Sequence, residues 1–280
     1  MKPSIRELLQ VLDSFAPVAL AEKWDNVGLL VGSPDNSVGS ILIGLDPTTS
    51  LVDEAIAISA DTIITHHPVI FKPLSAIDTS DPAGRLLQKA LRHDINIIGA
   101  HTNLDSAVDG VNDVLGDALG LANRVPLVPA EDGEESATGL GRIGSYASPI
   151  SRKEFLKRLF ALLDVQSLNI AGKLPEKIST VAVCGGSGSD FAPLAHTRGA
   201  DVYLSAEIKH STAIWAREAG FVVIDGGHYA TEKPATFYLA RKLKEIAAEK
   251  TWQLKIQLTE TEEHPFVSLH INNLEDEPIT

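Results

Sequence analysis

The chain has 280 residues, a length that favours about two domains. Its 37 acidic and 24 basic residues give a formal net charge of −13, which disfavours nucleic acid as a partner because it would repel a phosphate backbone. The single cysteine cannot form an internal disulfide, and no apolar run has the length of a signal peptide core or a membrane span. We therefore expect a cytoplasmic protein that does not enter a membrane.

The first 126 residues predict helices that alternate with strands. A helix is expected over residues 4–16, because Ser4 and Glu7 have the spacing of a capping box and apolar residues recur on one face. Runs rich in β-branched residues predict buried strands, and amphipathic segments between them predict helices. The expected strands cover residues 40–46, 61–65 and 95–100, and the expected helices cover 50–59 and 82–93. Such alternation is typical of a parallel sheet with helices on both faces.

Near residue 126 the composition changes to a proline-containing and then acidic stretch, which favours an exposed connection. We place a domain boundary there and predict a smaller inserted α/β domain over residues 127–220. From residue 221 the chain is expected to return to the first domain, through a strand at 221–225, a helix at 234–249 and a strand at 253–258. The predicted fold is α/β with two α/β domains. The first is a mixed or parallel sheet built from both chain ends, residues 1–126 and 221–280.

Residue types that commonly bind metal ions follow three of the predicted strands within a few residues. They are His66 and His67, then His101 and Asp105, then His228 and Glu232. Ligands bind beyond the carboxyl ends of strands in open parallel sheets, so the fold would gather these residues. Imidazole and carboxylate together suit zinc, iron, manganese or cobalt better than calcium or magnesium. Because six ligands exceed the needs of one tetrahedral ion, we predict two divalent metal ions.

Each of these pairs also has a simpler interpretation. A single histidine is more often a hydrogen-bonded residue than a ligand, and His101 with Asp105 could cap a helix. The recurrence at three strand ends favours the metal site. His210 lies three residues after Glu207, on one helical face, and could reach the same cleft. The glycine-rich segment 184–189 could cradle a phosphate, although a tight turn after a strand explains it more simply.

Four segments carry a resemblance to a known family: residues 24–32, the double-histidine segment 65–74, residues 101–105 and residues 227–232. Together they resemble the Nif-three-like dinuclear metal family, whose members are often labelled GTP cyclohydrolase type 2 homologues. The resemblance extends over nearly the whole chain. It implies a two-domain α/β fold with an inserted second domain, and assembly into a ring-shaped homo-hexamer.

The resemblance also implies how the ligands divide. It assigns His66 and His67 to different ions, Asp105 to one ion, His228 to the other and Glu232 to both, with His101 as a ligand or a close neighbour. The sequence departs from the family over residues 205–211, where alanine replaces the usual glycine and serine follows a single histidine. The second histidine that would contact a substrate in the family therefore has no counterpart here.

The leading hypothesis is a metal-dependent hydrolase acting on a small phosphate-bearing or purine-nucleotide substrate, because a two-ion site can activate water. Glu232, His101 and His210 are the candidate catalytic residues, the two histidines as groups that move protons. Opening of a guanine ring, the reaction in the family label, is implied by the resemblance alone. The alternative hypothesis is a non-catalytic regulatory or scaffold protein that works through protein partners. An exchangeable water on the ions would favour catalysis, and a closed ligand shell would favour structure.

Overall fold

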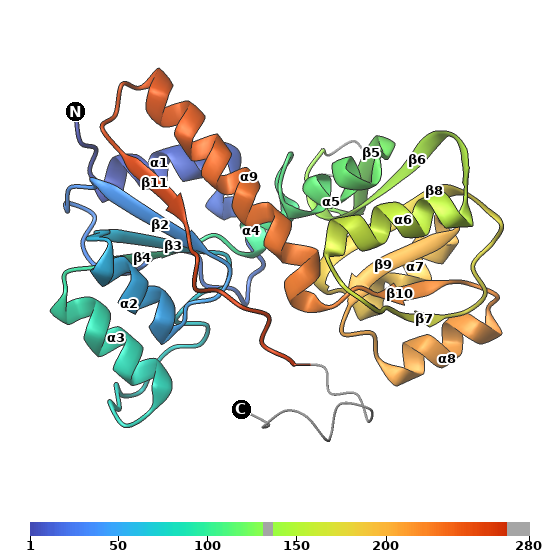
Figure 1. Cartoon of the computed structure of the whole chain (residues 1–280), viewed down its shortest axis with the longest axis horizontal. Helices are drawn as coiled ribbons and strands as arrows, with labels where there is room; N and C mark the ends of the chain where they lie inside the picture. Colours follow the sequence, from blue (N-terminus) through green and yellow to red (C-terminus); the bar gives the residue numbers. More distant parts are fainter. Residues whose placement is uncertain (131–136, 268–280) are drawn as a thin grey trace.

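The computed structural model describes residues 1–130 and 137–267, and they form two sheets flanked by helices. The two sheets lie side by side, and helix α9 (His228–Glu249) extends from one unit to the other (Figure 1). The predicted α/β class with two α/β units is confirmed. The acidic stretch 131–135, predicted to be an exposed connection, lies outside the described residues. No helix in the described ranges combines the length and apolarity needed to cross a bilayer.

The first sheet has five strands in the order β1-β4-β3-β2-β11, and every neighbouring pair except β1–β4 is parallel. The strands are β1 (Gly28–Val31), β2 (Ser40–Gly44), β3 (Thr62–Thr65), β4 (Asn96–Gly99) and β11 (Lys255–Leu258). Strand β11 comes from the C-terminal part of the chain and pairs with β2. The prediction of a mixed sheet built from both chain ends is therefore confirmed.

Helices cover both faces of this first sheet because successive side chains of its strands point to opposite faces. In β2, Ile41 and Ile43 belong to an apolar layer with α1 and the C-terminal half of α9. Leu42, between them, packs on the other face with α2 and α3. These helices are α1 (Ile5–Phe15), which begins with the predicted capping box, α2 (Thr49–Ala57) and α3 (Pro82–Arg92).

The second sheet has six strands in the order β5-β6-β8-β9-β10-β7. The pairs β8–β9 and β9–β10 are parallel, and the other pairs are antiparallel. The strands are β5 (Ala122–Pro129), β6 (Gly139–Ser151), β7 (Asn169–Ala171), β8 (Lys177–Ser187), β9 (Val202–Ala206) and β10 (Val223–Asp225). All of them lie between β4 and β11 along the chain, so this unit is inserted into the first, as predicted.

The place of β10 differs from the sequence prediction. β10 pairs with β9 and β7, so the prediction that residues 221–225 return to the first sheet is wrong. A short strand that is apolar on both faces carries no information about which sheet it joins. The chain returns to the first sheet through α9 instead. Residue 126 lies within β5, an edge strand, where a proline removes no hydrogen bond from the interior of the sheet.

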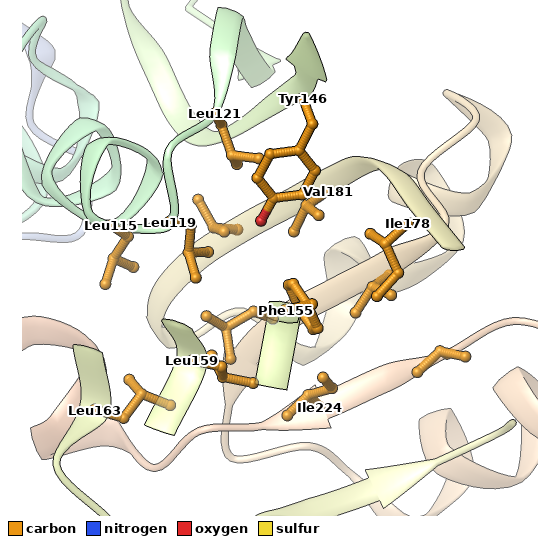
Figure 2. Close-up of a cluster of buried hydrophobic side chains, with 14 of the residues drawn as sticks. Leu115, Leu119, Leu121, Tyr146, Phe155, Leu159, Leu163, Ile178, Val181 and Ile224 are labelled. Atoms are coloured by element: carbon orange, nitrogen blue, oxygen red, sulfur yellow. The ribbon is translucent and has the colours of Figure 1, made fainter. Parts of the chain in front are cut away.

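Figure 2 shows the larger apolar cluster of the second unit, where Leu115, Phe155 and Val181 are fully buried. It lies between the sheet and the helices α5 and α6. The opposite face, with Ala182 and Tyr203, is covered by α7 and α8. The remaining helices are α4 (Thr102–Ser106), α5 (Val111–Leu119), α6 (Arg152–Leu163), α7 (Ala192–Thr197), α8 (His210–Glu218) and two single turns, η1 (Val18–Leu20) and η2 (Ser189–Phe191).

Candidate metal centre

Three histidines lie at the carboxyl edge of the first sheet. His66 and His67 follow β3 directly, and their backbone amides donate to Gly44 O (3.4 Å) and Leu45 O (3.0 Å), which extends the parallel pairing with β2. His101 follows β4, the neighbouring strand. The three imidazole rings consequently meet, with centroids between 5.1 and 5.5 Å apart. The convergence predicted from the strand ends is therefore present.

Helix α9 supplies two more side chains to this edge. His228 and Glu232 are four residues apart at its beginning, so both lie on the same side of the helix. The Oε2 atom of Glu232 lies 3.0 Å from Nε2 of both His67 and His228. Its Oε1 atom lies 3.7 Å from Nε2 of His66. One carboxylate thus contacts three imidazoles with its two oxygens.

Asp105 completes the cluster from α4, the short helix that begins after His101. Its Oδ1 atom lies 3.5 Å from Nε2 of His66. Three overlapping groups of these side chains have ligand atoms within 4.8 Å of one another and could each hold a metal ion. The groups are His66, Asp105 and Glu232; His67, His228 and Glu232; and His66, His67 and His101. All six predicted metal-ligating residues belong to at least one group.

Each histidine of the cluster donates its Nδ1 hydrogen to an oxygen atom. The acceptors are Ala100 O for His66 (2.8 Å), Asp46 for His67 (2.7 Å), Asp25 for His101 (2.8 Å) and Glu207 for His228 (2.9 Å). Carbonyl and carboxylate oxygens only accept, so the proton is on Nδ1. A neutral ring of this tautomer presents the lone pair of Nε2, which is how metal-binding histidines are usually held.

While the histidine rings are neutral, three polar atoms at the centre of the cluster are buried without a hydrogen-bond partner among the described residues: His66 Nε2, Asp105 Oδ1 and Glu232 Oε2. Buried polar atoms nearly always have a partner, so three such atoms in one cluster point to a missing cation. The Nε2 atoms of His67 and His228 are also only 3.2 Å apart. Lone pairs at that distance need a proton or a cation between them. The residues present therefore fit a divalent metal.

Burial and mutual contacts shift the pKa values in this cluster. Burial lowers the pKa of His67, but hydrogen bonds with Asp46 and Glu232 outweigh it and raise the pKa to about 10. The hydrogen bond with Glu232 raises the pKa of His228 to about 9, against the effect of burial. Burial raises the pKa of Asp105 to about 6. Without a metal, the His67 and His228 rings therefore take a second proton, which a divalent cation would displace.

The glycine-rich segment predicted as a turn is largely the end of β8, and it lies against Glu232. A Cβ atom at Gly186, where φ is +64°, would lie 2.1 Å from Oε1 of Glu232, so this position needs glycine. The amides of Gly185, Gly186 and Gly188 all donate to side chains of the protein. These amides are therefore engaged. The glycine-rich end of β8 positions a carboxylate and offers few free amides to a phosphate.

A cavity of about 550 Å³ opens beside the cluster. The side chains that line it include those of Trp24 and Phe71 and five from the cluster: His67, His101, Asp105, His228 and Glu232. The exposed fraction of the side chain is 2% for His66 and 3% for Glu232, but 21% for His67 and 34% for His228. The cluster is thus closed at the back and open toward the cavity.

Sequence reasoning did not identify the carboxylates that orient the histidine rings. Asp46 follows β2 as His66 follows β3, so the strand-end layout contained an indication of it. Asp25 lies in the loop before β1, and no local pattern marks it. His210, a predicted candidate, is the exposed first residue of α8 and does not occur among the described residues that line the cavity. Glu207, from the same segment, contacts the cluster instead through His228.

The fold and the cluster define a two-unit α/β protein with a histidine–carboxylate site that could hold metal. Residues 3–265 match the family model described as Duf34/NIF3 (NGG1p interacting factor 3). The chain belongs to this family, which confirms the resemblance inferred from its motifs. A Streptomyces coelicolor protein named "GTP cyclohydrolase 1 type 2 homolog" is 34% identical to it, over 95% of this chain and 94% of that protein.

Solved structures agree with this assignment. The structure of a Bacillus cereus protein related to NIF3 superposes with a TM-score of 0.89 at 27% identity, covering 96% of this chain and 99% of that one. A hypothetical protein from Staphylococcus aureus gives a TM-score of 0.88 at 30% identity, covering 95% and 99%. Both are similar to this chain over both of its units.

Proposed function

We propose that this protein is a hydrolase that holds two divalent ions in the histidine–carboxylate cluster and acts on a small molecule. The observation that carries the proposal is the position of Glu232, whose two oxygens face different ligand groups. Oε1 is near His66, in the group with Asp105, and Oε2 is near His67 and His228. A carboxylate in this position can bridge two ions. The division of the ligands supports placing His66 and His67 on different ions.

The donor set of imidazoles and carboxylates favours zinc, iron, manganese or cobalt. When bound, a pair of such ions would lower the pKa of a water molecule to near neutrality and polarise the bond under attack. The chain itself contributes orientation, because Asp25, Asp46 and Glu207 each fix a ligand ring. His101 borders the cavity, and its second ring nitrogen is left to bind an ion or to accept a proton from the substrate.

The substrate class rests on the relatives. Proteins from Streptomyces coelicolor and two Clostridium species carry the name GTP cyclohydrolase 1 type 2 homolog. We propose a purine nucleotide or another phosphate-bearing compound on this basis. The cavity volume of about 550 Å³ lies within the usual range for sites that bind small molecules.

A substrate panel tests the hydrolase proposal. The metal-loaded protein is incubated with GTP, other nucleotides and simple phosphoesters, and products are followed by chromatography and phosphate release. We expect turnover that falls by about a hundredfold or more in Glu232→Gln, since even the indirect partners of metal ligands contribute 10- to 100-fold. Glu249→Gln, an exposed glutamate at the end of the same helix, is the matched control. Absence of any Glu232-dependent turnover would contradict the proposal.

The second candidate is a non-catalytic protein in which the ions support a regulatory or scaffold role. The words "NGG1p interacting factor" in the family description favour it, because they name a protein interaction. The open side of the cluster favours the hydrolase, since structural metal sites are usually closed. Chelation separates the two candidates. Loss of turnover with an unchanged circular dichroism spectrum supports catalysis, whereas loss of folding or assembly supports the structural role.

Assembly into a homo-hexamer and a cytoplasmic location belong to the same proposal. The hexamer is supported by the family membership, and the location by the lone cysteine Cys184, which suits a reducing compartment. Light scattering in solution measures the assembly directly. A particle with the mass of six chains is expected, and a stable monomer would contradict this part of the proposal.

A further inference from the structure

We infer that the cavity beside the metal cluster binds a planar aromatic heterocycle by stacking on Trp24 and Phe71, and that the protein recognises this ring more than any phosphate attached to it. The inference rests on the proposed function and deepens it by naming the part of the substrate that is recognised. Four observations support it: the exposure of the two aromatic side chains, the anchoring of the loops that carry them, their distance from the ligands and the charge of the cavity.

Trp24 and Phe71 expose aromatic surface at the cavity. Their exposed fractions are 58% and 44%, and their ring centroids are 5.7 Å apart. Both line the cavity, and neither belongs to the buried apolar clusters of the described residues. A ligand in the cavity could bury these ring faces, and burying an aromatic ring is favourable. Their exposed faces are available to a ligand.

The loops that carry the aromatic pair are tied to each other and to the metal cluster. Nδ2 of Asn26 donates to Ile70 O at 2.6 Å, which joins the loop of the tryptophan to the loop of the phenylalanine. Asp25, between Trp24 and Asn26, accepts a hydrogen bond from Nδ1 of His101 at 2.8 Å. The loops that carry the pair are thus anchored before a ligand arrives, which reduces the conformational entropy lost on binding.

The aromatic pair lies one ring away from the metal ligands. The centroids of Trp24 and Phe71 are 6.1 and 6.2 Å from that of His101, in edge-on arrangements. The His101 ring is in turn 5.2 Å from that of His66. A flat ring stacked against Trp24 would extend one edge past His101 toward the cluster. A nitrogen or carbonyl oxygen on that edge could then approach the ions.

The charge of the cavity disfavours recognition through phosphate. In the part of the chain that the structure describes, no lysine or arginine lines the cavity, and the carboxylates of Glu22, Asp105 and Glu232 do. Phosphate groups are usually bound by arginine, lysine or free backbone amides, and the nearby amides of Gly185 and Gly186 are already engaged. A nucleobase or nucleoside therefore suits this aromatic and acidic lining better than a polyphosphate, which would depend on the ions alone for its binding.

Equilibrium binding to the metal-loaded full-length chain tests this inference without requiring turnover. Isothermal titration calorimetry compares guanosine and adenosine, which carry a ring and no phosphate, with ribose 5-phosphate, which carries a phosphate and no ring. We expect the nucleosides to bind at least about tenfold more tightly. Trp24→Ala and Phe71→Ala should weaken nucleoside binding by about tenfold each, a usual effect of removing a stacked ring. Phe237→Ala, which removes an equally exposed phenylalanine on α9, should leave it unchanged.

Three outcomes would overturn the inference: tighter binding of ribose 5-phosphate, failure of both nucleosides to bind, or nucleoside affinities that do not change in the two cavity variants. Light scattering on Trp24→Ala adds a fourth, because a change in the mass of the assembly would assign the aromatic pair to a subunit contact. Failure of the hydrolase proposal looks different. Stacking-dependent binding without any turnover would contradict the hydrolase and leave this inference standing.

Discussion

A Cβ atom at Gly186 would lie 2.1 Å from Oε1 of Glu232, well inside van der Waals contact. Gly186 belongs to β8 of the inserted unit, and Glu232 belongs to α9. The carboxylate that faces both ligand groups therefore owes its position to a missing side chain in another element. The backbone at this glycine has φ of +64°, where residues with a Cβ are strained.

Replacing Gly186 should empty the metal site. In Gly186→Ala the new methyl group displaces the Glu232 carboxylate, so we expect the bound metal per chain to fall by at least half in elemental analysis of purified protein. The positive φ should also cost about 1 kcal/mol of stability. Gly199→Ala is the matched control, because φ is +81° there and no described atom lies within 4 Å of the added carbon. Full metal content in Gly186→Ala would show that the carboxylate is not a ligand.

The carboxylates that accept the Nδ1 hydrogens should tune metal affinity. Asp46→Asn and Glu207→Gln remove the charged acceptors of His67 and His228. We expect each substitution to lower the affinity for one metal ion by about 10- to 100-fold. Competition with a chromogenic chelator measures the effect. Asp190→Asn serves as the control, because that exposed carboxylate pairs only with Lys209 among the described residues. Equal affinities in all three variants would contradict this role.

Metal binding should release protons near neutral pH. In the metal-free protein the pKa is raised to about 10 for His67, despite burial, and to about 9 for His228, chiefly by Glu232. Since a free histidine titrates near 6.5, about two protons per chain should leave when the site fills at pH 7. Calorimetric titrations in buffers of different ionisation enthalpy count these protons. Binding without proton release would contradict the raised pKa values, because it would mean that both rings are already neutral at pH 7.

The same pKa shifts fix the pH dependence of the metal-free fold. Both histidines have folded pKa values above the unfolded value, so their contacts stabilise the fold fully below about pH 6.5. That stabilisation is lost as the pH rises through 9 and then 10. We therefore expect the thermal midpoint of the metal-free protein to fall between pH 7 and pH 10. In Glu232→Gln, where the partner charge is gone, the fall should be smaller.

The buried guanidinium of Arg142 should be important for stability. It is 2% exposed, and it bonds Asp113 of α5 and the carbonyl of Ala107, next to the helix that carries Asp105. Arg142→Met leaves the Asp113 carboxylate without its buried partner. We therefore expect the free energy of unfolding, measured in urea, to fall by about 3 kcal/mol. Asp117→Asn, which breaks an exposed pair with Arg124, should cost less than about 1 kcal/mol. A similar loss in both variants would contradict the role of burial.

Local patterns were sufficient for the two strands, β3 and β4, that are followed by His66, His67 and His101, whereas the helix expected from residue 234 begins at His228 instead. β-branched runs marked β3 and β4, and polar residues placed directly after them must lie at one edge once the strands are parallel. That rule brought His66 and His101 together without knowledge of the rest of the fold. The capping box at Ser4 likewise predicted the start of α1, because its two hydrogen bonds are local.

Tertiary contacts explain what the sequence did not predict. Val223 and Ile224 of β10 are buried on opposite faces, and only pairing with β9 and β7 decides the sheet that the strand joins. Asp25 is 76 residues away from His101 in sequence, so its hydrogen bond depends on how the loop before β1 folds back. The exposure of Trp24 also depends on tertiary structure, since a tryptophan is usually largely buried.

Helix α9 connects the two units mechanically as well as in sequence. Ala230, near its beginning, packs into the core of the six-stranded sheet, while Leu239 and Leu243 further along pack on the five-stranded sheet. The histidine–carboxylate cluster lies where α9 meets the strand ends of the first sheet. Bound ions would therefore link α9 to that sheet and restrict the movement of one unit relative to the other. Removal of the ions by chelation should allow the angle between the two units to vary, and small-angle X-ray scattering would then record a broader distribution of molecular dimensions.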